Sequence, residues 1–461
     1  MMRSMYSGVS GLRVHQSKMD TIGNNIANVN TVGFKRGQVT FQEVFSQVTK
    51  GASAPSGGKG GTNPQQVGMG VAIGSINTIH TVGPGQRTDN PTDLMIDGEG
   101  FFVVSDDSNF NNKFYTRAGN FTLDRDGSLV TADGFKVLGY MADENGNISS
   151  DVSGIRINKS DTSAPTATEN IIFKGNLNAN TEITADDKEG ELIDTVVTDS
   201  LGNSYKITFE MRRIADTGGN QSWEMAVKRV TDQGTGRYLE NADGTPINDI
   251  LIGDGVNDNK ITLQFNDKGK LVSTPALSSL NLNEIEFNYY KDKTEVDTAD
   301  RVGPSGSFEQ IKLFDPSNPE SYKNIHQYAN DADFKPYAHG NTSGTLEGFT
   351  IDPTGTVTGV FTNGERRALG QIMLAKFDNP MGLQKMGSNF FLDTRNSGEA
   401  QFGTGGSSGF GAVNGGTLEM SNVDISLEFT EMITTQRGFQ ANSRIITTSD
   451  EMLQELVNLK R

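Results

Sequence analysis

The chain has 461 residues, which is enough for two to four domains with hydrophobic cores. Its 54 glycines lack collagen periodicity and only 34% of its residues are hydrophobic, so the composition favours a turn-rich β protein over a helical enzyme. A net charge of −17 argues against nucleic acid as a partner, and the absence of cysteine excludes disulfides, thiolate metal sites and a cysteine nucleophile.

The N-terminal segment has the apolar spacing of a helix. Met5, Leu12, Met19 and Ile26 recur every seven residues. Glycines lie in the same segment, and each costs about 1 kcal/mol of helix propensity. We therefore expect a helix that is marginal alone and needs a partner surface. An ordinary amphipathic core helix is the alternative interpretation.

An asparagine-rich stretch follows this segment. Asn24, Asn25 and Asn28 have side chains that compete for backbone hydrogen bonds, which is unusual inside a helix. Gly33, which precedes Phe34, is free to take a positive φ. We predict that the helix gives way here to a shaped, polar turn.

Residues 37–92 are predicted to form a linker or extended connection. The spacing around Phe41 is compatible with a short helix, and residues 51–61 are flexible by composition. Apolar residues then alternate loosely over 67–82, as in an extended strand.

Alternating apolar residues and turn signals predict two β domains. Residues 93–165 and 345–417 form the first, and residues 166–344 form a second β domain inserted into it, built as a sandwich or a barrel. The turns at Arg125–Gly127 and at Gly202–Asn203 each predict a hairpin.

The C-terminal segment again has helical spacing. Ser421 is the expected N-cap, with Asp424 three residues later as a short-armed capping box, so a helix is predicted from Asn422 to Leu459. At 1.5 Å per residue it is roughly 55 Å long. Apolar residues recur every seven positions, and one more widens the stripe near the end: Ile425, Met432, Phe439, Ile446, Leu453 and Leu456.

The two heptad seams predict that the terminal helices pack together as a coiled coil. Residues 1–50 carry a net charge of +4 and residues 418–461 carry −3. This opposite sign is either a chance distribution over a solvated surface or a sign that the two ends pair. The expected fold is mainly β and multidomain with α-helical termini. Residues 1–36 and 418–461 form the helical domain, and each β domain is an insertion into the part before it.

No catalytic or cofactor motif stands out. The four histidines are widely spread and lack metal-ligand spacing. Residues 124–128 resemble part of a calcium loop, but the position of the glycine favours a hairpin turn. The polar loop at 253–259 is at best a weak cation site. We therefore predict a protein that is not an enzyme and binds no cofactor and no metal.

Several segments resemble the bacterial flagellar axial proteins, which are the rod, hook and hook-associated proteins. Residues 7–12 (SGVSGL) and 22–35 (IGNNIANVNTVGFK) are similar to the N-terminal signature of this family. Residues 93–104 resemble the core shared by its hook and rod members, and residues 436–456 resemble its C-terminal helix. The large insertion at 166–344 favours the hook type over the distal rod type, which remains the alternative.

The resemblance implies a structural subunit of the flagellar hook, a curved flexible tube that joins rod to filament and transmits torque as a universal joint. It implies export through the flagellar export apparatus without a cleaved signal peptide, and an extracellular location. The implied partners are further copies of the chain, the distal rod protein, the hook cap protein and the hook–filament junction protein. The helix seams and the asparagine-rich turn then become candidate assembly contacts.

Two hypotheses that assign the chain to other classes of protein compete with the flagellar hypothesis. A secreted β-rich adhesin would need a signal peptide or an anchor, and we recognise neither, nor any run of eighteen apolar residues that would span a membrane. A carbohydrate-active enzyme would need paired acids in a distinctive motif, and none stands out.

Overall fold

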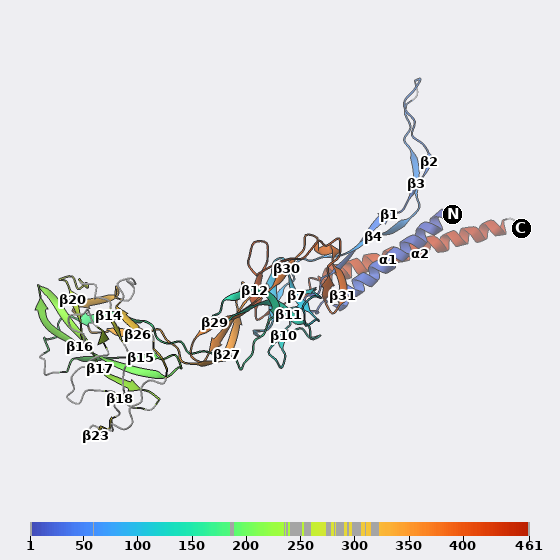
Figure 1. Cartoon of the computed structure of the whole chain (residues 1–461). Coiled ribbons are helices and arrows are strands. Elements are labelled where there is room, and N and C mark those ends of the chain that lie inside the picture. The colour runs from blue at the N-terminus through green and yellow to red at the C-terminus, as the bar shows by residue number, and fades with distance from the viewer. Residues whose placement is uncertain are drawn as a thin grey trace. The chain divides into compact units, whose positions relative to one another are not determined.

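The computed structural model describes residues 2–58, 60–184, 189–234, 236, 238–239, 251–252, 260–272, 278–280, 282, 290–292, 295–296, 306–308, 310–314 and 322–459. The chain divides into two compact units (Figure 1). Met1–Lys159, Gly348–Val360 and Arg366–Arg461 form the first, and Ser160–Glu347 and Phe361–Glu365 form the second. The finer division into domains stays a prediction, and the polar loop at 253–259 lies outside the described residues.

The fold class predicted from the sequence is confirmed. The described chain is mainly β, and its two long helices, α1 (Met2–Ala27) and α2 (Ile425–Asn458), pack against each other within the first unit. Both chain termini lie at the same end of this helix pair (Figure 1). The start of α1 contacts the end of α2 and the end of α1 contacts its start, so the helices run antiparallel.

The start of α2 corrects the predicted N-cap. Asp424 caps the helix, because its Oδ1 accepts hydrogen bonds from the backbone N–H groups of Ser426 at 2.9 Å and Leu427 at 3.3 Å. Ser421 is instead buried, and its Oγ accepts from the N–H of Val423. The helix therefore begins three residues later than predicted, with a carboxylate at the positive end of its dipole.

The connection between α1 and the β part consists of strands. β1 (Gly37–Glu43) pairs antiparallel with β4 (Val71–Thr78), and β2 (Ser46–Lys50) pairs antiparallel with β3 (Gln65–Gly68). The short helix considered around Phe41 is wrong, because aromatic and β-branched residues here favour a pleated ladder. The extended strand expected further along this connection is confirmed.

The β part of the first unit is one main sheet with smaller ladders beside it. Its strands are β5 (Gly85–Arg87), β6 (Leu94–Asp97), β7 (Phe101–Ser105), β8 (Phe114–Thr116), β9 (Thr122–Leu123), β10 (Leu129–Val130), β11 (Lys136–Ala142), β12 (Ile148–Gly154), β28 (Thr356–Phe361), β29 (Arg366–Ile372), β30 (Leu374–Lys376), β31 (Gln384–Gly387), β32 (Phe390–Leu392), β33 (Gln401–Gly403), β34 (Ala412–Gly415) and β35 (Thr417–Glu419). These strands contribute the order β28-β29-β11-β7-β8-β32-β31 to the main sheet. Its buried core is rich in aromatic side chains: Phe377 contacts Tyr115 edge to face, with ring centroids 4.7 Å apart.

One kind of turn recurs between strands in both units. An Asp or Asn side chain accepts the N–H groups two and four residues later, and the glycine three residues later has a positive φ. At Asp124, Oδ1 accepts from Asp126 at 2.9 Å and from Ser128 at 2.6 Å, so the hairpin predicted here is confirmed. The other turns begin at Asp143, Asp199, Asn266 and Asp352.

The second unit has its own hydrophobic core. Its strands are β13 (Thr162–Ser163), β14 (Ile171–Asn178), β15 (Glu191–Thr198), β16 (Ser204–Thr217), β17 (Asn220–Asp232), β18 (Tyr238–Leu239), β19 (Leu251–Ile252), β20 (Lys260–Phe265), β21 (Ser278–Leu280), β22 (Tyr290–Asp292), β23 (Glu295–Val296), β24 (Ile311–Phe314), β25 (Ile325–Tyr328), β26 (Lys335–Ala338) and the start of β27 (Gly344–Ile351), whose residues from Gly348 on belong to the first unit. A sheet of order β15-β16-β17-β18 contains the long antiparallel pair β16–β17. Trp223 and Phe173 are buried in this core. The hairpin predicted over Gly202–Asn203 is confirmed, because Thr198 pairs with Ser204.

Candidate assembly junction

The contact between α1 and α2 uses polar side chains at several levels. Near the chain termini, Ser4 Oγ lies 3.4 Å from Ser449 Oγ. Further along, Lys18 Nζ lies 3.1 Å from Glu431 Oε2 in a partly exposed ion pair. Neither contact is strong in water, so the pair is not held by ionic attraction alone.

Glycines let the two helices approach closely. A Cβ added at Gly11 would lie 2.6 Å from Asn442 Nδ2, and one at Gly438 would lie 2.7 Å from the His15 ring. A Cβ added at Gly23, by contrast, would have nothing within 4 Å. Gly11 and Gly438 are therefore required by the contact, although glycine weakens each helix on its own.

The side of α2 that faces α1 is polar at its most buried positions. Glu428, Thr435 and Ser449 are the buried residues of α2. They share one seven-residue spacing with Asn442, whose amide lies against Gly11. A polar heptad thus occupies the centre of the contact within one chain, where an apolar seam was expected.

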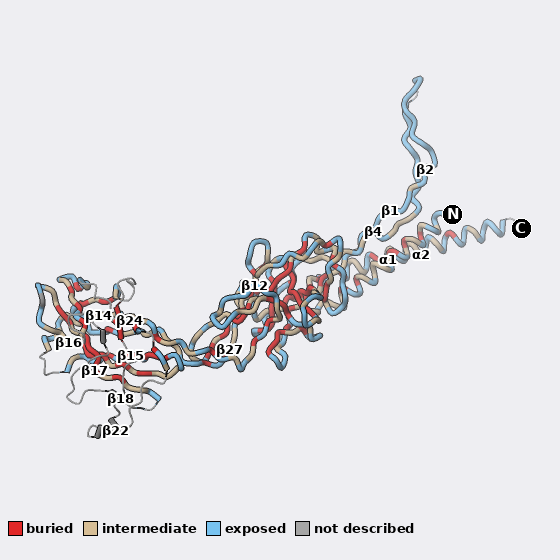
Figure 2. Tube along the Cα trace, in the orientation of Figure 1, coloured by how far each residue is buried: buried red, intermediate tan, exposed pale blue. Residues whose placement is uncertain are grey.

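The residues of the predicted apolar seams are less buried than this polar centre. Figure 2 shows that intermediate and exposed stretches make up much of both helices. Seven of the seam residues are half-buried: Met5, Leu12, Met19, Ile26, Met432, Ile446 and Leu453. Three are exposed in the single chain: Ile425, Phe439 and Leu456. The seams therefore leave apolar surface that one chain does not cover, and their part in assembly stays a prediction.

The helix α1 continues through Asn24 and Asn25 to Ala27, and the polar turn that connects it to β1 follows. Asn25 is buried, and its side chain donates to the carbonyl oxygen of Gly37 and accepts from the N–H of Gly37, both at 2.9 Å. It also donates to Glu428 Oε2 at 3.2 Å, which ties the end of α1 to α2. Asn28 Nδ2 donates to the carbonyl oxygen of Asn24 at 2.9 Å, so the end of α1 is capped from within the turn.

Gly33 has the positive φ that the sequence predicted, at 68°. Its N–H donates to the carbonyl oxygen of Glu419 at 2.7 Å, and a Cβ added here would lie 2.5 Å from the backbone nitrogen of Ala118. Phe34 is the residue after Gly33, and Lys385 Nζ lies over its ring, 5.1 Å from the ring centroid. The turn is therefore packed against both the C-terminal segment and the β part.

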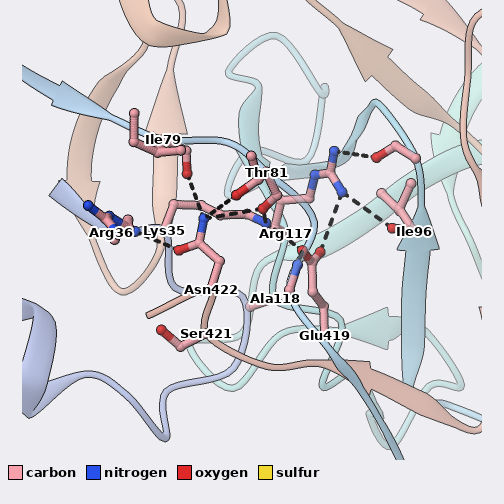
Figure 3. A network of polar contacts seen from close by, with 12 residues as sticks. Lys35, Arg36, Ile79, Thr81, Ile96, Arg117, Ala118, Glu419, Ser421 and Asn422 are labelled. Carbon is pink, nitrogen blue, oxygen red and sulfur yellow. Dashed lines mark hydrogen bonds and ion pairs between the residues drawn. The ribbon is translucent and has the colours of Figure 1, made fainter. Parts of the chain in front are cut away.

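Three charged side chains from distant parts of the chain meet behind this turn (Figure 3). Lys35, Arg117 and Glu419 are all buried. Lys35 Nζ donates to Glu419 Oε1, and Arg117 Nη1 lies 3.4 Å from Glu419 Oε2. Lys35 Nζ also donates to the carbonyl oxygen of Thr81 at 2.7 Å, and the N–H of Gly83 donates to Glu419 Oε1 at 2.9 Å. The carboxylate thus has the several partners that a buried charge requires.

The carboxylate is what holds the two cations together. Burial lowers the pKa of the Lys35 ammonium, and the attraction and hydrogen bond of Glu419 oppose this shift. Burial also lowers the pKa of the Arg117 guanidinium, again against the attraction of Glu419. Without Glu419, two cations would share a buried site with no anion between them.

A neutral contact reinforces the charged one. Asn422 Nδ2 donates to the carbonyl oxygen of Ile79 at 2.8 Å and to Thr81 Oγ1 at 2.9 Å, and its Oδ1 accepts from the N–H of Arg36 at 2.8 Å (Figure 3). The segment leading into α2, the strand leading out of the turn and the connection before β5 are therefore fixed to one another. We call this group, with the Lys35–Arg117–Glu419 cluster, the junction.

None of Lys35, Arg117, Glu419 and Asn422 is recognisable from the sequence as a site residue. Lys35 lies 384 positions from Glu419 and Arg117 lies 302 positions from it, and no local spacing reports such a pairing. The one available signal was the opposite net charge of the two ends of the chain. The ion pair between Lys35 and Glu419 joins one residue from each of these ends.

Among the described residues, no group of three metal-ligand side chains occurs and no helix has the length and apolarity needed to cross a membrane. His80, the histidine beside the junction, packs edge to face on Phe101 with ring centroids 5.5 Å apart. Burial, then repulsion from Lys35 and Arg117, lowers the pKa of His80 to about 3. It is therefore a neutral packing residue at physiological pH.

Family models match the three segments that meet at the junction. The model described as "Flagella basal body rod protein" matches residues 5–35, which contain Lys35. The model "Flagellar hook protein FlgE/F/G D1 domain" matches residues 95–163, which contain Arg117, and "Flagellar basal body rod FlgEFG protein C-terminal" matches residues 414–459, which contain Glu419.

Full-length relatives point the same way. The chain is 39% identical over 478 aligned residues to the flagellar hook protein FlgE of Borreliella burgdorferi, and the alignment covers 100% of both chains. The chain belongs to the flagellar hook and rod protein family. It is also 37% identical over 504 aligned residues to the flagellar hook protein FlgE of Treponema pallidum, and 30% identical over 462 to the flagellar basal-body rod protein FlgG of Bacillus subtilis, each over 100% of both chains. The recognition from sequence motifs is confirmed, and so is the expected function as a structural protein of the flagellar hook.

Proposed function

We propose that the chain polymerises into the curved tube of the hook, where it joins rod to filament and transmits torque while it bends. The observation that carries this proposal is the junction. Buried charges and amides fix the terminal helices to the β part of the same unit, so a force applied to one is passed to the other. The exposed apolar residues of the helices support burial between copies.

In this arrangement the terminal helical domain, residues 1–36 with 418–461, lines the inner tube. The β domain of residues 93–165 with 345–417 lies outside it, and the inserted domain of residues 166–344 is outermost. The connection of residues 37–92 lies between the helical and β domains. These placements rest on the family resemblance and on the nested order of the segments along the chain.

The partners we propose are further copies of the chain along the tube, the distal rod protein at its base, the hook cap protein during growth and the hook–filament junction protein at its end. The chain reaches this extracellular site through the flagellar export apparatus without a cleaved signal peptide. It needs no cofactor or metal and performs no catalysis.

Complementation tests the proposal. A strain of the source organism that lacks this gene should make rods that end without hooks, and the full chain supplied in trans should restore hooks visible by electron microscopy. A chain truncated after Asp450 should not restore them, because α2 loses its last turns. A purified chain that stays monomeric and restores no hooks contradicts the proposal.

The distal rod type is the second candidate, and the rod relative at 30% identity favours keeping it. The same deletion strain separates the two. A rod protein's loss shortens the rod itself, whereas a hook protein's loss leaves a rod of normal length. Measuring rod length in isolated basal bodies decides between them.

The asparagine-rich turn gives a more local test. Alanine at Asn24, Asn25 and Asn28 removes the side-chain bonds that cap α1 and tie it to β1 and α2. We expect hook assembly to fall while the second unit stays folded, as reported by fluorescence of Trp223, the one tryptophan of the chain. Normal hooks from these variants would reduce the stretch to a simple turn.

A further inference from the structure

The end of α2 projects beyond the start of α1 (Figure 1). The hydroxyl pair Ser4–Ser449 lies two residues from the start of α1, which begins at Met2, but nine residues from the end of α2 at Asn458. At 1.5 Å per residue, about 10 Å of α2 therefore has no α1 beside it. We call residues 450–458 of α2, which include this stretch, the overhang.

The overhang is apolar and acidic. Met452 and Leu456 are 50% and 51% exposed, one helical turn apart. Glu451 and Glu455 are also one turn apart and exposed, and Asp450 adds a third carboxylate. The overhang contains no Lys or Arg.

The outer side of α1 is apolar and basic. Tyr6 is 64% exposed and Val9 is also exposed, at a spacing that places both on one side of the helix. Arg3 and Arg13 are exposed on either side of them along the chain, and the first acidic residue of the sequence is Asp20. The other sides of α1 face α2 and the β1–β4 ladder. We call Arg3, Tyr6, Val9 and Arg13 the α1 face.

The overhang cannot reach the α1 face of its own chain. Ser449 already lies beside Ser4, and the antiparallel direction carries every later α2 residue away from Val9 and Arg13. The two surfaces match in apolar content and are opposite in charge, yet each is uncovered within one chain. Only a second copy can bring them together.

We propose that the overhang of one copy docks on the α1 face of a second copy, with Met452 and Leu456 against Tyr6 and Val9. This inference rests on the proposed function and specifies one contact of the polymer. The two surfaces are different patches of one chain, so the contact is heterologous and leaves a free patch at each end. Such a contact joins more than two copies, into a ring or an open helical array, rather than closing as a two-fold dimer.

Cross-linking in the cysteine-free chain tests this contact directly. A disulfide forms only between cysteines whose Cα atoms lie within about 7 Å. We expect hooks of the doubly substituted chain Val9→Cys/Leu456→Cys to give a ladder of covalent multimers on oxidation. The matched control is Val9→Cys/Ile433→Cys, since Ile433 is exposed on α2 but outside the overhang. Hooks that assemble without a ladder, or an equal ladder in the control, overturn the proposal.

Charge reversal gives a second measurement on the purified full-length chain. Glu451→Arg/Glu455→Arg and Arg3→Glu/Arg13→Glu should each weaken self-association about tenfold in sedimentation at low salt, because two attractions become repulsions. Mixing the two variants should restore it, since their altered surfaces again match. Asp106→Arg/Asp151→Arg, which reverses two exposed charges on the β part, is the control and should leave association unchanged.

The outcomes separate this contact from the function itself. The contact is overturned if neither charge reversal weakens self-association. It is also overturned if mixing the two reversed variants does not restore self-association. If the wild-type chain restores hooks while the contact fails these tests, the proposed function stands and the helices pack in another register. A chain that restores no hooks but shows the ladder and the charge rescue in purified form supports the contact and contradicts the function.

Discussion

The two ends of the helix pair are held in different ways. At the end near the β part, Asn25 and Glu428 are buried, and the adjoining junction surrounds one carboxylate with two cations. At the end near the chain termini, a hydroxyl pair is followed by an overhang whose end extends past the start of α1. The contacts at the junction are therefore made within one chain, whereas the proposed contact of the overhang needs a second copy.

This contrast suits a subunit that must be built into a polymer. Interactions that decide the shape of one chain should be complete before assembly, and those that join copies should remain uncovered until then. The junction pairs its opposite charges within one chain. The polar centre is the most buried part of α2 within one chain, whereas parts of the apolar flanks stay exposed.

Removing the carboxylate should have the largest effect. Glu419→Gln leaves Lys35 and Arg117 buried without a counter-charge, which typically costs about 3–5 kcal/mol. We expect the urea concentration at which half of the first unit is unfolded to fall. Circular dichroism of the helices at 222 nm measures this midpoint. Glu431→Gln breaks only the partly exposed pair with Lys18 and should cost less than about 1 kcal/mol.

The second unit is the internal control for that experiment. Trp223 is the one tryptophan and belongs to the second unit, so its fluorescence reports the unfolding of that unit. The urea midpoint of this transition should be unchanged in the Glu419 variant. A shift of the Trp223 transition, or a Glu419 variant as stable as the Glu431 variant, would show that the junction does not control the first unit in particular.

The same contrast explains what the sequence could predict. Hairpins such as the one after Asp124 and the two terminal helices follow local rules of turn chemistry and periodicity, so they were predictable. The junction joins residues hundreds of positions apart and has no local pattern. The α1–α2 contact was misjudged for another reason: Gly11 was counted as a cost to helix formation, when it makes room for Asn442.

A change of pH should weaken the junction end next. The folded-state pKa of His80, lowered to about 3 by burial and then by Lys35 and Arg117, lies below the ordinary value of 6.5. The folded chain favours the neutral ring, whereas the unfolded chain binds a proton below pH 6.5. The free energy of unfolding therefore keeps its full value above pH 6.5 and decreases as pH falls. Between pH 7 and pH 5 this amounts to about 2 kcal/mol.

The variant His80→Phe isolates that contribution, because it keeps the aromatic contact with Phe101 and removes the titration. The loss of first-unit stability between pH 7 and pH 5, measured in urea at 222 nm, should be smaller in the variant by about the same 2 kcal/mol. Equal losses in the two proteins would mean that the ring is protonated in the folded chain and that the junction tolerates it.

The smallest effect should distinguish close helix contact from free helix surface. Gly23→Ala adds a methyl group where nothing lies within 4 Å, so it should stabilise the first unit by about 0.5–1 kcal/mol through helix propensity alone. Gly11→Ala gains the same propensity but puts its methyl group 2.6 Å from Asn442 Nδ2, so that side chain must move and the gain should vanish or reverse. Thermal unfolding at 222 nm compares the two variants directly. The double variant Gly11→Ala/Asn442→Ala should recover the stability that the single change at Gly11 loses, because the side-chain amide of Asn442 no longer obstructs the added methyl group. If Gly11→Ala stabilises as much as Gly23→Ala, the helices do not touch at this level, and the polar heptad of α2 cannot be the centre of their contact.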